Sequence, residues 1–154
     1  MRTPPALSEP RIHLPAVYGV RPGCPFLRRI PATGERPMQF EAKPLPAGIE
    51  LDAEAGILRG VSPPAGSYPV RVRAMNRHGT NETTFTIVSG SVLALTPPMG
   101  WNHWYTHYDR VTDGVIRRAA ELMVSSGMAD HGYEYVSIDD CWMRGPPEDE
   151  LARL

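Results

Sequence analysis

The distribution of proline divides this chain into two parts that cannot share one type of structure. Fifteen of the 17 prolines lie at or before Pro98, and the other two are Pro146 and Pro147. Proline is excluded from helix interiors and from central strands. The sequence therefore predicts short strands and turns in the first part, and leaves the proline-free stretch Met99–Gly145 able to form longer helices and buried strands.

Before the break, short runs of alternating apolar and polar residues are separated by turn residues. Ile49–Asp52 and Ile57–Val61 flank a turn that ends in glycine, and together they predict a β-hairpin. Tyr68–Met75 alternates apolar side chains with arginine, and alternate residues of Thr83–Ile87 form one apolar face. Regularly spaced short strands of this kind favour an all-β immunoglobulin-like sandwich, which we place at residues 12–90.

After the break the apolar period becomes helical. Apolar residues recur at helical spacing over Val115–Met123, with Thr112 as the predicted N-cap and Gly127 as the predicted helix stop. The run Tyr133–Ile138 predicts a strand, and Val92–Leu95 is a candidate for the strand before the helix. This order predicts a βαβ unit with a parallel sheet, which cannot bury both of its faces alone.

Length and charge exclude several classes of protein. A chain of 154 residues is too short for a complete (β/α)₈ barrel, which needs about 250. A formal net charge of -1 argues against a nucleic-acid partner or a polybasic membrane patch. No apolar run approaches the roughly 20 residues of a membrane span. The first ten residues show no signal peptide, and localisation stays undetermined.

Two short segments combine side chains that could bind a substrate. Trp101 and Trp104 flank an amide and an imidazole, a combination that suits a sugar, although spacing alone favours packing of both indoles in a core or loop. Asp139 and Asp140 directly follow the predicted strand, where α/β folds place their sites. Carboxylates there could accept hydrogen bonds from hydroxyls, bind a metal, transfer protons or cap the next helix.

Metal and thiol chemistry are the weaker alternatives. His103 and His107 have the spacing of a helical zinc pair, but Trp101–Tyr108 shows no helical pattern, so we predict two loop histidines and no metal site. Cys141 has no paired base in the sequence and is interpreted as a structural thiol. With Cys24 it makes only two cysteines, too few for a disulfide-rich scaffold.

Three segments carry a resemblance to a known family: Leu93–Trp104 (LALTPPMGWNHW), Glu121–Tyr133 (ELMVSSGMADHGY) and Tyr135–Trp142 (YVSIDDCW). In this order they resemble the first part of the catalytic domain in glycoside hydrolase family 27, the α-galactosidase family. Pro10–Glu35 resembles part of the immunoglobulin-like module that precedes the barrel in some bacterial members. The resemblance implies a mixed fold, in which the sandwich is followed by the first βαβ portion of an incomplete (β/α)₈ barrel at residues 92–154.

The resemblance also implies a function. In such enzymes the residues matching Trp101, Asp139 and Asp140 bind the terminal galactose, and two carboxylates from later strands perform retaining hydrolysis. No catalytic residue, cofactor or metal is therefore expected in this chain, and we expect the isolated chain to be inactive. The implied partner is a galactoside-containing oligo- or polysaccharide, and the parent enzyme is expected to be secreted or periplasmic.

Three points stay open in the sequence. The family's cysteine matching Cys141 often pairs with one just after the first strand, but Tyr105–Asp113 contains none. α-N-acetylgalactosaminidase specificity is an alternative, because the loops that sense the 2-substituent would lie beyond Leu154. A non-catalytic module that binds carbohydrate or protein through the sandwich is the alternative from another class. The turn-like acidic segment Arg144–Glu150 predicts that the barrel is cut short here.

Overall fold

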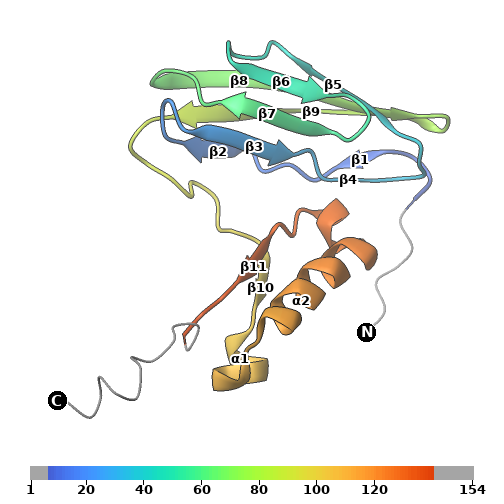
Figure 1. Ribbon diagram of the computed structural model, residues 1–154. Coiled ribbons are helices and arrows are strands. Elements are labelled where there is room, and N and C mark those ends of the chain that lie inside the picture. The colour runs from blue at the N-terminus through green and yellow to red at the C-terminus, as the bar shows by residue number, and fades with distance from the viewer. Residues whose placement is uncertain (1–6, 141–154) are drawn as a thin grey trace.

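The computed structural model describes residues 7–140 and shows a two-layered β-sandwich followed by a small strand–helix–strand unit (Figure 1). One sheet of the sandwich has the order β2-β9-β8-β5 and the other the order β3-β7-β6, with β1 and β4 as a separate antiparallel pair. The nine strands of this part are β1 Arg11–Ile12, β2 Val17–Val20, β3 Pro25–Arg29, β4 Ala32–Thr33, β5 Gln39–Lys43, β6 Ile49–Asp52, β7 Ile57–Val61, β8 Gly66–Asn76 and β9 Gly79–Ser89.

The predicted hairpin and the two long strands are confirmed. Strands β6 and β7 pair antiparallel with Asp52 opposite Ile57, and the Asp52 carboxylate accepts hydrogen bonds from the backbone N–H groups of Glu54 and Ala55. These two bonds hold the pKa of Asp52 below its ordinary value. Gly56 closes the turn at φ +67°, and a Cβ there would meet the Phe40 ring at 2.9 Å, so the turn requires glycine.

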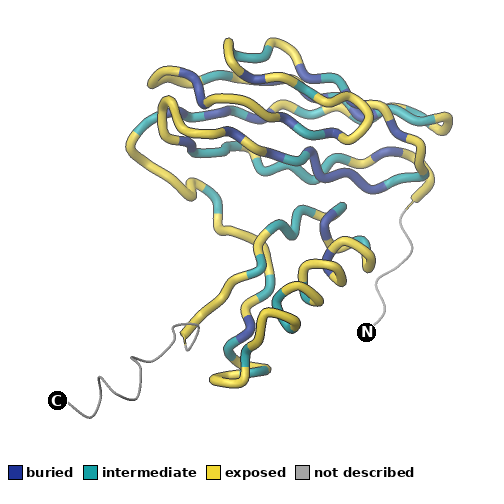
Figure 2. Tube along the Cα trace, viewed as in Figure 1, coloured by how far each residue is buried: buried dark blue, intermediate teal, exposed yellow. Residues whose placement is uncertain are grey.

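The core lies between the two sheets, as alternation along the strands requires. Strand β8 points Val70, Val72 and Ala74 inward, and all three are fully buried. The facing sheet contributes Leu58, which is also fully buried. Figure 2 shows this burial concentrated in the sandwich, whereas the C-terminal unit is largely exposed.

The C-terminal unit contains β10 Gly100–Asn102, the short helix α1 Trp104–His107, helix α2 Asp113–Ser125 and β11 Tyr135–Ser137, with 3₁₀ turns at Tyr108–Arg110 and Met128–His131. Strands β10 and β11 are parallel neighbours, as the βαβ prediction requires. The N-cap prediction for α2 is confirmed, because the Thr112 hydroxyl accepts a hydrogen bond from the Val115 N–H at 3.3 Å. The stop is confirmed as well, since Gly127 adopts the left-handed conformation at φ +83°.

Two expectations for this unit are wrong. Val92–Leu95 is not a strand but an irregular connection. Its side chains do not pack in a buried layer, and Val92 is 58% exposed. The first strand of the unit is instead β10, which contains Trp101. The stretch before Tyr108 is also not all loop, since α1 places His103 at its N-cap and His107 at its end. Over residues 7–140 no helix is long and apolar enough to span a membrane.

Candidate functional site

The carboxyl ends of β10 and β11 form the candidate site. These strands pair in parallel with Asn102 opposite Ser137, so the residues that follow each strand emerge side by side. The Asn102 side-chain amide donates a hydrogen bond to Asp139 Oδ2 at 2.8 Å. An amide from the end of the first strand is thereby joined to an acid that follows the second, and both side chains are exposed.

The same amide group organises the chain on the other side of the site. Asn102 Oδ1 accepts a hydrogen bond from the backbone N–H of Trp104 at 2.8 Å, which fixes the start of α1. The other oxygen of Asp139, Oδ1, accepts from the backbone N–H of Asp140 at 2.9 Å. Asp139 and Asp140 thus lie together at one end of the strand pair, where carboxylate oxygens can accept hydrogen bonds from hydroxyl groups.

Trp101 and Asn102 are neighbours on β10 and point to opposite faces of the strand. The Trp101 ring makes an edge contact with His107 at a centroid distance of 6.0 Å and helps to line a groove of about 820 Å³ against α2. Hydrogen bonds therefore join Asn102, Asp139 and Asp140, while Trp101 contacts His107 and lines the groove beside α2.

Asn102 is the residue whose role the sequence reasoning missed. It appeared only as one polar group among aromatic neighbours, although its position one residue after Trp101 could have indicated the opposite face of a strand. That face could be assigned only once β10 was known to begin at Gly100. A Cβ at Gly100 would come within 2.1 Å of the Tyr135 carbonyl oxygen. This close approach of β11 explains why glycine occupies the first position of β10.

The histidines of this region do not converge on a ligand. His103 is fully buried, and neither of its ring nitrogens has a partner among the described residues. His107 packs against Trp101 instead of facing His103. Within residues 7–140 no cluster of three or more His, Cys, Asp or Glu side chains could hold a metal ion. Cys24 is an exposed free thiol, while Cys141 lies outside the described residues.

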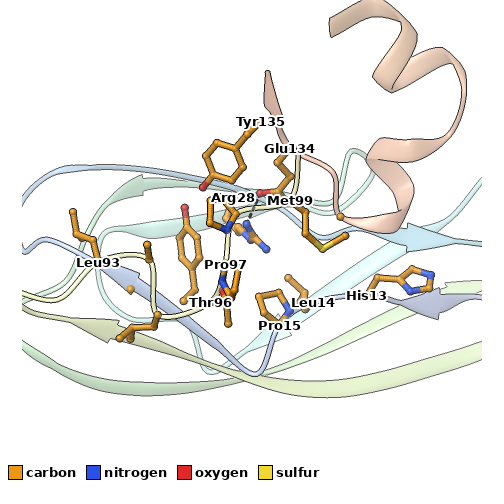
Figure 3. A pocket seen from close by; sticks show the side chains of 16 residues that line it. His13, Leu14, Pro15, Arg28, Leu93, Thr96, Pro97, Met99, Glu134 and Tyr135 are labelled. Carbon is orange, nitrogen blue, oxygen red and sulfur yellow. Dashed lines mark hydrogen bonds and ion pairs between the residues drawn. The ribbon is translucent and has the colours of Figure 1, made fainter. Parts of the chain in front are cut away.

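The sandwich contacts the strand pair at the end opposite this site. Arg28 of β3 forms an ion pair with Glu134, the residue before β11, and Arg29 Nη2 lies 2.5 Å from Asp130 Oδ1. Burial raises the pKa of Glu134, although the neighbouring Arg28 guanidinium opposes this by stabilising the carboxylate. A pocket of about 600 Å³ beside this ion pair is lined by the sandwich, by the connection after β9 and by the start of β11 (Figure 3).

Comparison with known proteins assigns each part of the chain to a family. The family model described as "Putative Ig domain" matches residues 10–90, and the model described as "Alpha galactosidase A" matches residues 96–154. A "Probable alpha-galactosidase" of Dictyostelium discoideum is 55% identical over 53 residues, which cover 34% of this chain and 14% of that protein. "Alpha-galactosidase A" of Cellvibrio japonicus is 56% identical over 50 residues, covering 32% and 12% respectively.

A solved structure has the same arrangement over most of the chain. The crystal structure of a "putative alpha-galactosidase" from Bacteroides fragilis superposes with a TM-score of 0.84 at 41% identity, covering 92% of this chain and 30% of that one. The present chain thus spans less than a fifth of the length of the curated relatives named above and under a third of the solved one. The chain belongs to the "Putative Ig domain" family through residues 10–90, and it continues into the beginning of an α-galactosidase family domain at residues 96–154.

Proposed function

We propose that this chain is the N-terminal part of a retaining glycoside hydrolase that acts on terminal α-D-galactosides. Its family assignment and its curated relatives support the glycosidase class. The finer proposal depends on the hydrogen bond between Asn102 and Asp139, which joins the carboxyl ends of two parallel strands. That edge of the sheet is where (β/α)₈ enzymes hold their substrates.

In this proposal Asp139 and Asp140 accept hydrogen bonds from the hydroxyls of the terminal sugar. Asn102 holds Asp139 in position through its side-chain N–H at 2.8 Å. Trp101 contacts His107 and lines the groove beside α2, and by the family resemblance its indole is the surface against which the sugar ring packs. Residues 12–90 form the immunoglobulin-like unit, and residues 92–154 form the start of the barrel.

Retaining hydrolysis needs two carboxyl groups about 5–5.5 Å apart, one as nucleophile and one as acid and base. Asp139 is already engaged by Asn102, and the family resemblance assigns the reacting carboxylates to later strands. We therefore propose that residues 1–154 alone bind at most one side of a sugar and do not turn it over.

The test is hydrolysis of an aryl α-galactoside by a polypeptide in which this chain is continued by the rest of a barrel. Asp139→Asn and Asp140→Asn should each lower kcat/KM by at least about tenfold, because a carboxylate bound to a hydroxyl contributes roughly 1.5–3 kcal/mol. The matched control is Asp113→Asn, which makes the same substitution at an exposed acid on α2 and should leave kcat/KM unchanged. Normal turnover by the Asp139 and Asp140 variants would overturn the site assignment.

Two further measurements separate the alternative functions. Turnover of the 2-acetamido analogue in preference to the galactoside would indicate α-N-acetylgalactosaminidase specificity instead. Calorimetry of residues 12–90 with galactosides distinguishes the enzyme from a non-catalytic binding module. Binding of galactosides by residues 12–90 alone would favour the binding module. Hydrolysis by residues 1–154 alone would contradict the proposed inactivity.

A further inference from the structure

The ion pair between Arg28 and Glu134 joins the sandwich to the first residue before β11. Arg28 is buried in β3 with only 7% of its side chain exposed, and its guanidinium carbon lies 4.5 Å from the centre of the Tyr18 ring. The guanidinium is therefore held by an aromatic face as well as by the Glu134 carboxylate. Figure 3 shows the two charged groups meeting beside the pocket, with the connection that leads to β10 nearby.

A second ionic contact holds the same segment. Asp130, which lies in the 3₁₀ turn before β11, is 2.5 Å from Arg29 Nη2 and 3.0 Å from Arg36 Nη2. The rings of His13 and His131 also contact each other across this junction, tilted by 38° at a centroid distance of 5.0 Å. The sandwich thus contacts the chain between α2 and β11 at more than one point.

Glu134 is directly linked to the strand pair that carries the candidate site. The backbone N–H groups of Glu134 and Tyr135 both donate to the Met99 carbonyl, at 3.0 and 3.2 Å, which fixes the starting end of the pair. At its other end Asn102 lies opposite Ser137, and Asp139 follows two residues later. Four residues lie between Glu134 and Asp139, and the five steps along extended chain span roughly 16 Å.

Within the described residues this strand pair has little burial of its own. A two-stranded ribbon is marginally stable in water, and here Tyr135 is 44% and Ile138 50% exposed. Met123 and Ala129 are the buried apolar side chains that the described part of the unit supplies nearby. The contact of Glu134 with the buried Arg28 therefore adds a tertiary restraint to the Met99 hydrogen bonds at the start of β11.

We propose that Arg28 is a positioning residue, through which the sandwich sets the placement of Asn102 and Asp139 at the far end of the β10–β11 pair. The immunoglobulin-like unit then supports and orients the candidate sugar site, and it need not bind sugar itself. The inference rests on the proposed function only in naming that far end a sugar site. The mechanical coupling between the two ends stands without it.

Hydrogen exchange of single backbone amides in the 154-residue chain tests this coupling. The reporter is the Trp104 N–H, which is bonded to Asn102 Oδ1 at the end of the strand pair that carries the candidate site. The reference is the Ser126 N–H, bonded to the Leu122 carbonyl at the end of α2. Arg28→Met removes the charge and keeps an apolar side chain of similar length.

In Arg28→Met we expect Trp104 exchange to accelerate by about tenfold relative to Ser126, because local opening of the strand pair exposes the first amide before the second. Arg28→Lys retains the charge and should restore most of the protection. The matched control is Arg73→Met, which removes ion pairs with Glu41 and Glu82 on the outer surface of the other sheet and should change neither amide.

Equal acceleration at Trp104 and Ser126 would mean that Arg28 only stabilises the unit as a whole, and would overturn the positioning role. Unchanged Trp104 exchange in Arg28→Met would overturn it directly. If Arg28→Met fails to fold, Glu134→Gln breaks the same charge pair with a smaller change, and the same ratio decides. The exchange measurement involves no sugar, so it is independent of the hydrolysis assay. Coupling between the two ends of the strand pair without galactoside hydrolysis would refute only the proposed function. Galactoside hydrolysis without this coupling would refute only the inference about Arg28.

Discussion

The two parts of this chain differ in how completely each buries its own apolar surface. The sandwich encloses a continuous core that includes Phe85, Ile87 and Leu58, all fully buried. In the strand–helix–strand unit the buried apolar side chains of the described region are Met123 and Ala129, while Val124 on the same helix is 65% exposed. The first part has the packing of a finished domain, and the second has the surface of a domain that needs further elements.

This difference teaches that amphipathic sequence and completed packing are separate properties. Helix α2 has a proper N-cap at Thr112 and a left-handed stop at Gly127, so its ends are fully specified locally. Nevertheless, Met123 is the one buried residue of this helix, and its apolar residues Ala120, Leu122 and Val124 are exposed. Capping contributes about 1 kcal/mol, whereas burying one large apolar side chain contributes about 1.5–3 kcal/mol. The stability of the second part therefore depends on what packs against it.

Core truncation should give the largest difference between the parts. Phe85→Ala should destabilise the sandwich by about 3–5 kcal/mol, because it opens a cavity in a close-packed core. Met123→Ala should cost clearly less, since Met123 lies outside the continuous core and is 6% exposed. Urea unfolding measures both, with the β-sheet circular dichroism signal reporting the sandwich. All three tryptophans follow the proline break, so their fluorescence reports the second part.

The control for this comparison is Leu27→Ala on β3, where the side chain is 71% exposed. A substitution of that kind should change stability by no more than about 0.5 kcal/mol. Equal losses for Phe85→Ala and Met123→Ala would show that the second part is packed as well as the first, and the contrast between them would fail.

Association of the isolated chain should be the next largest effect. Leu122 and Val124 on α2 and Ile138 after β11 are 46%, 65% and 50% exposed, which leaves an apolar surface of the kind that associates in water. Light scattering should show oligomers that grow with concentration, and Val124→Lys should reduce them. The matched substitution Val61→Lys, on the sandwich at 51% exposure, should have less effect. A monodisperse monomer of the unaltered chain would contradict this prediction.

Local sequence predicted the sandwich strands β6 to β9 and the boundaries of α2, and it marked none of the strands β1 to β5. The hairpin was found because its strands are bounded by turn residues, and the helix because its cap and stop are coded by Thr112 and Gly127. These features depend on neighbours in sequence. The assignment of strand β10 failed for the opposite reason, since Gly100–Asn102 becomes a strand only by pairing with β11 more than 30 positions later.

The candidate site was predictable in its acids and not in its arrangement. Asp139 and Asp140 stand out because they follow an apolar strand, but their partner Asn102 emerges only from the parallel register that sets it opposite Ser137. The contact of Arg28 with Glu134 was equally invisible, because the two residues belong to different parts of the chain. No local pattern marks one arginine among 16 basic residues as buried.

The smallest expected effect concerns the histidine at the junction of the two parts. Burial lowers the pKa of His13, and the neighbouring His131 and Arg11 lower it further, against a smaller opposing effect of Asp130. The folded protein therefore binds this proton less readily than the unfolded chain does. As the pH falls through about 6.5, the unfolded chain gains the proton first and the free energy of unfolding should decrease.

His13→Gln should reduce this acid dependence and leave stability at neutral pH almost unchanged, because glutamine can still hydrogen-bond to the Thr33 hydroxyl that lies 2.9 Å from His13 Nε2. The measurement is urea unfolding at pH 7.5 and pH 5.5 for both proteins. His78→Gln, which alters a histidine at the β8–β9 turn remote from the junction, is the control. If the free energy of unfolding of His13→Gln falls with pH as much as that of the unaltered protein, His13 does not cause the acid dependence. The two parts of the chain would then differ in packing alone.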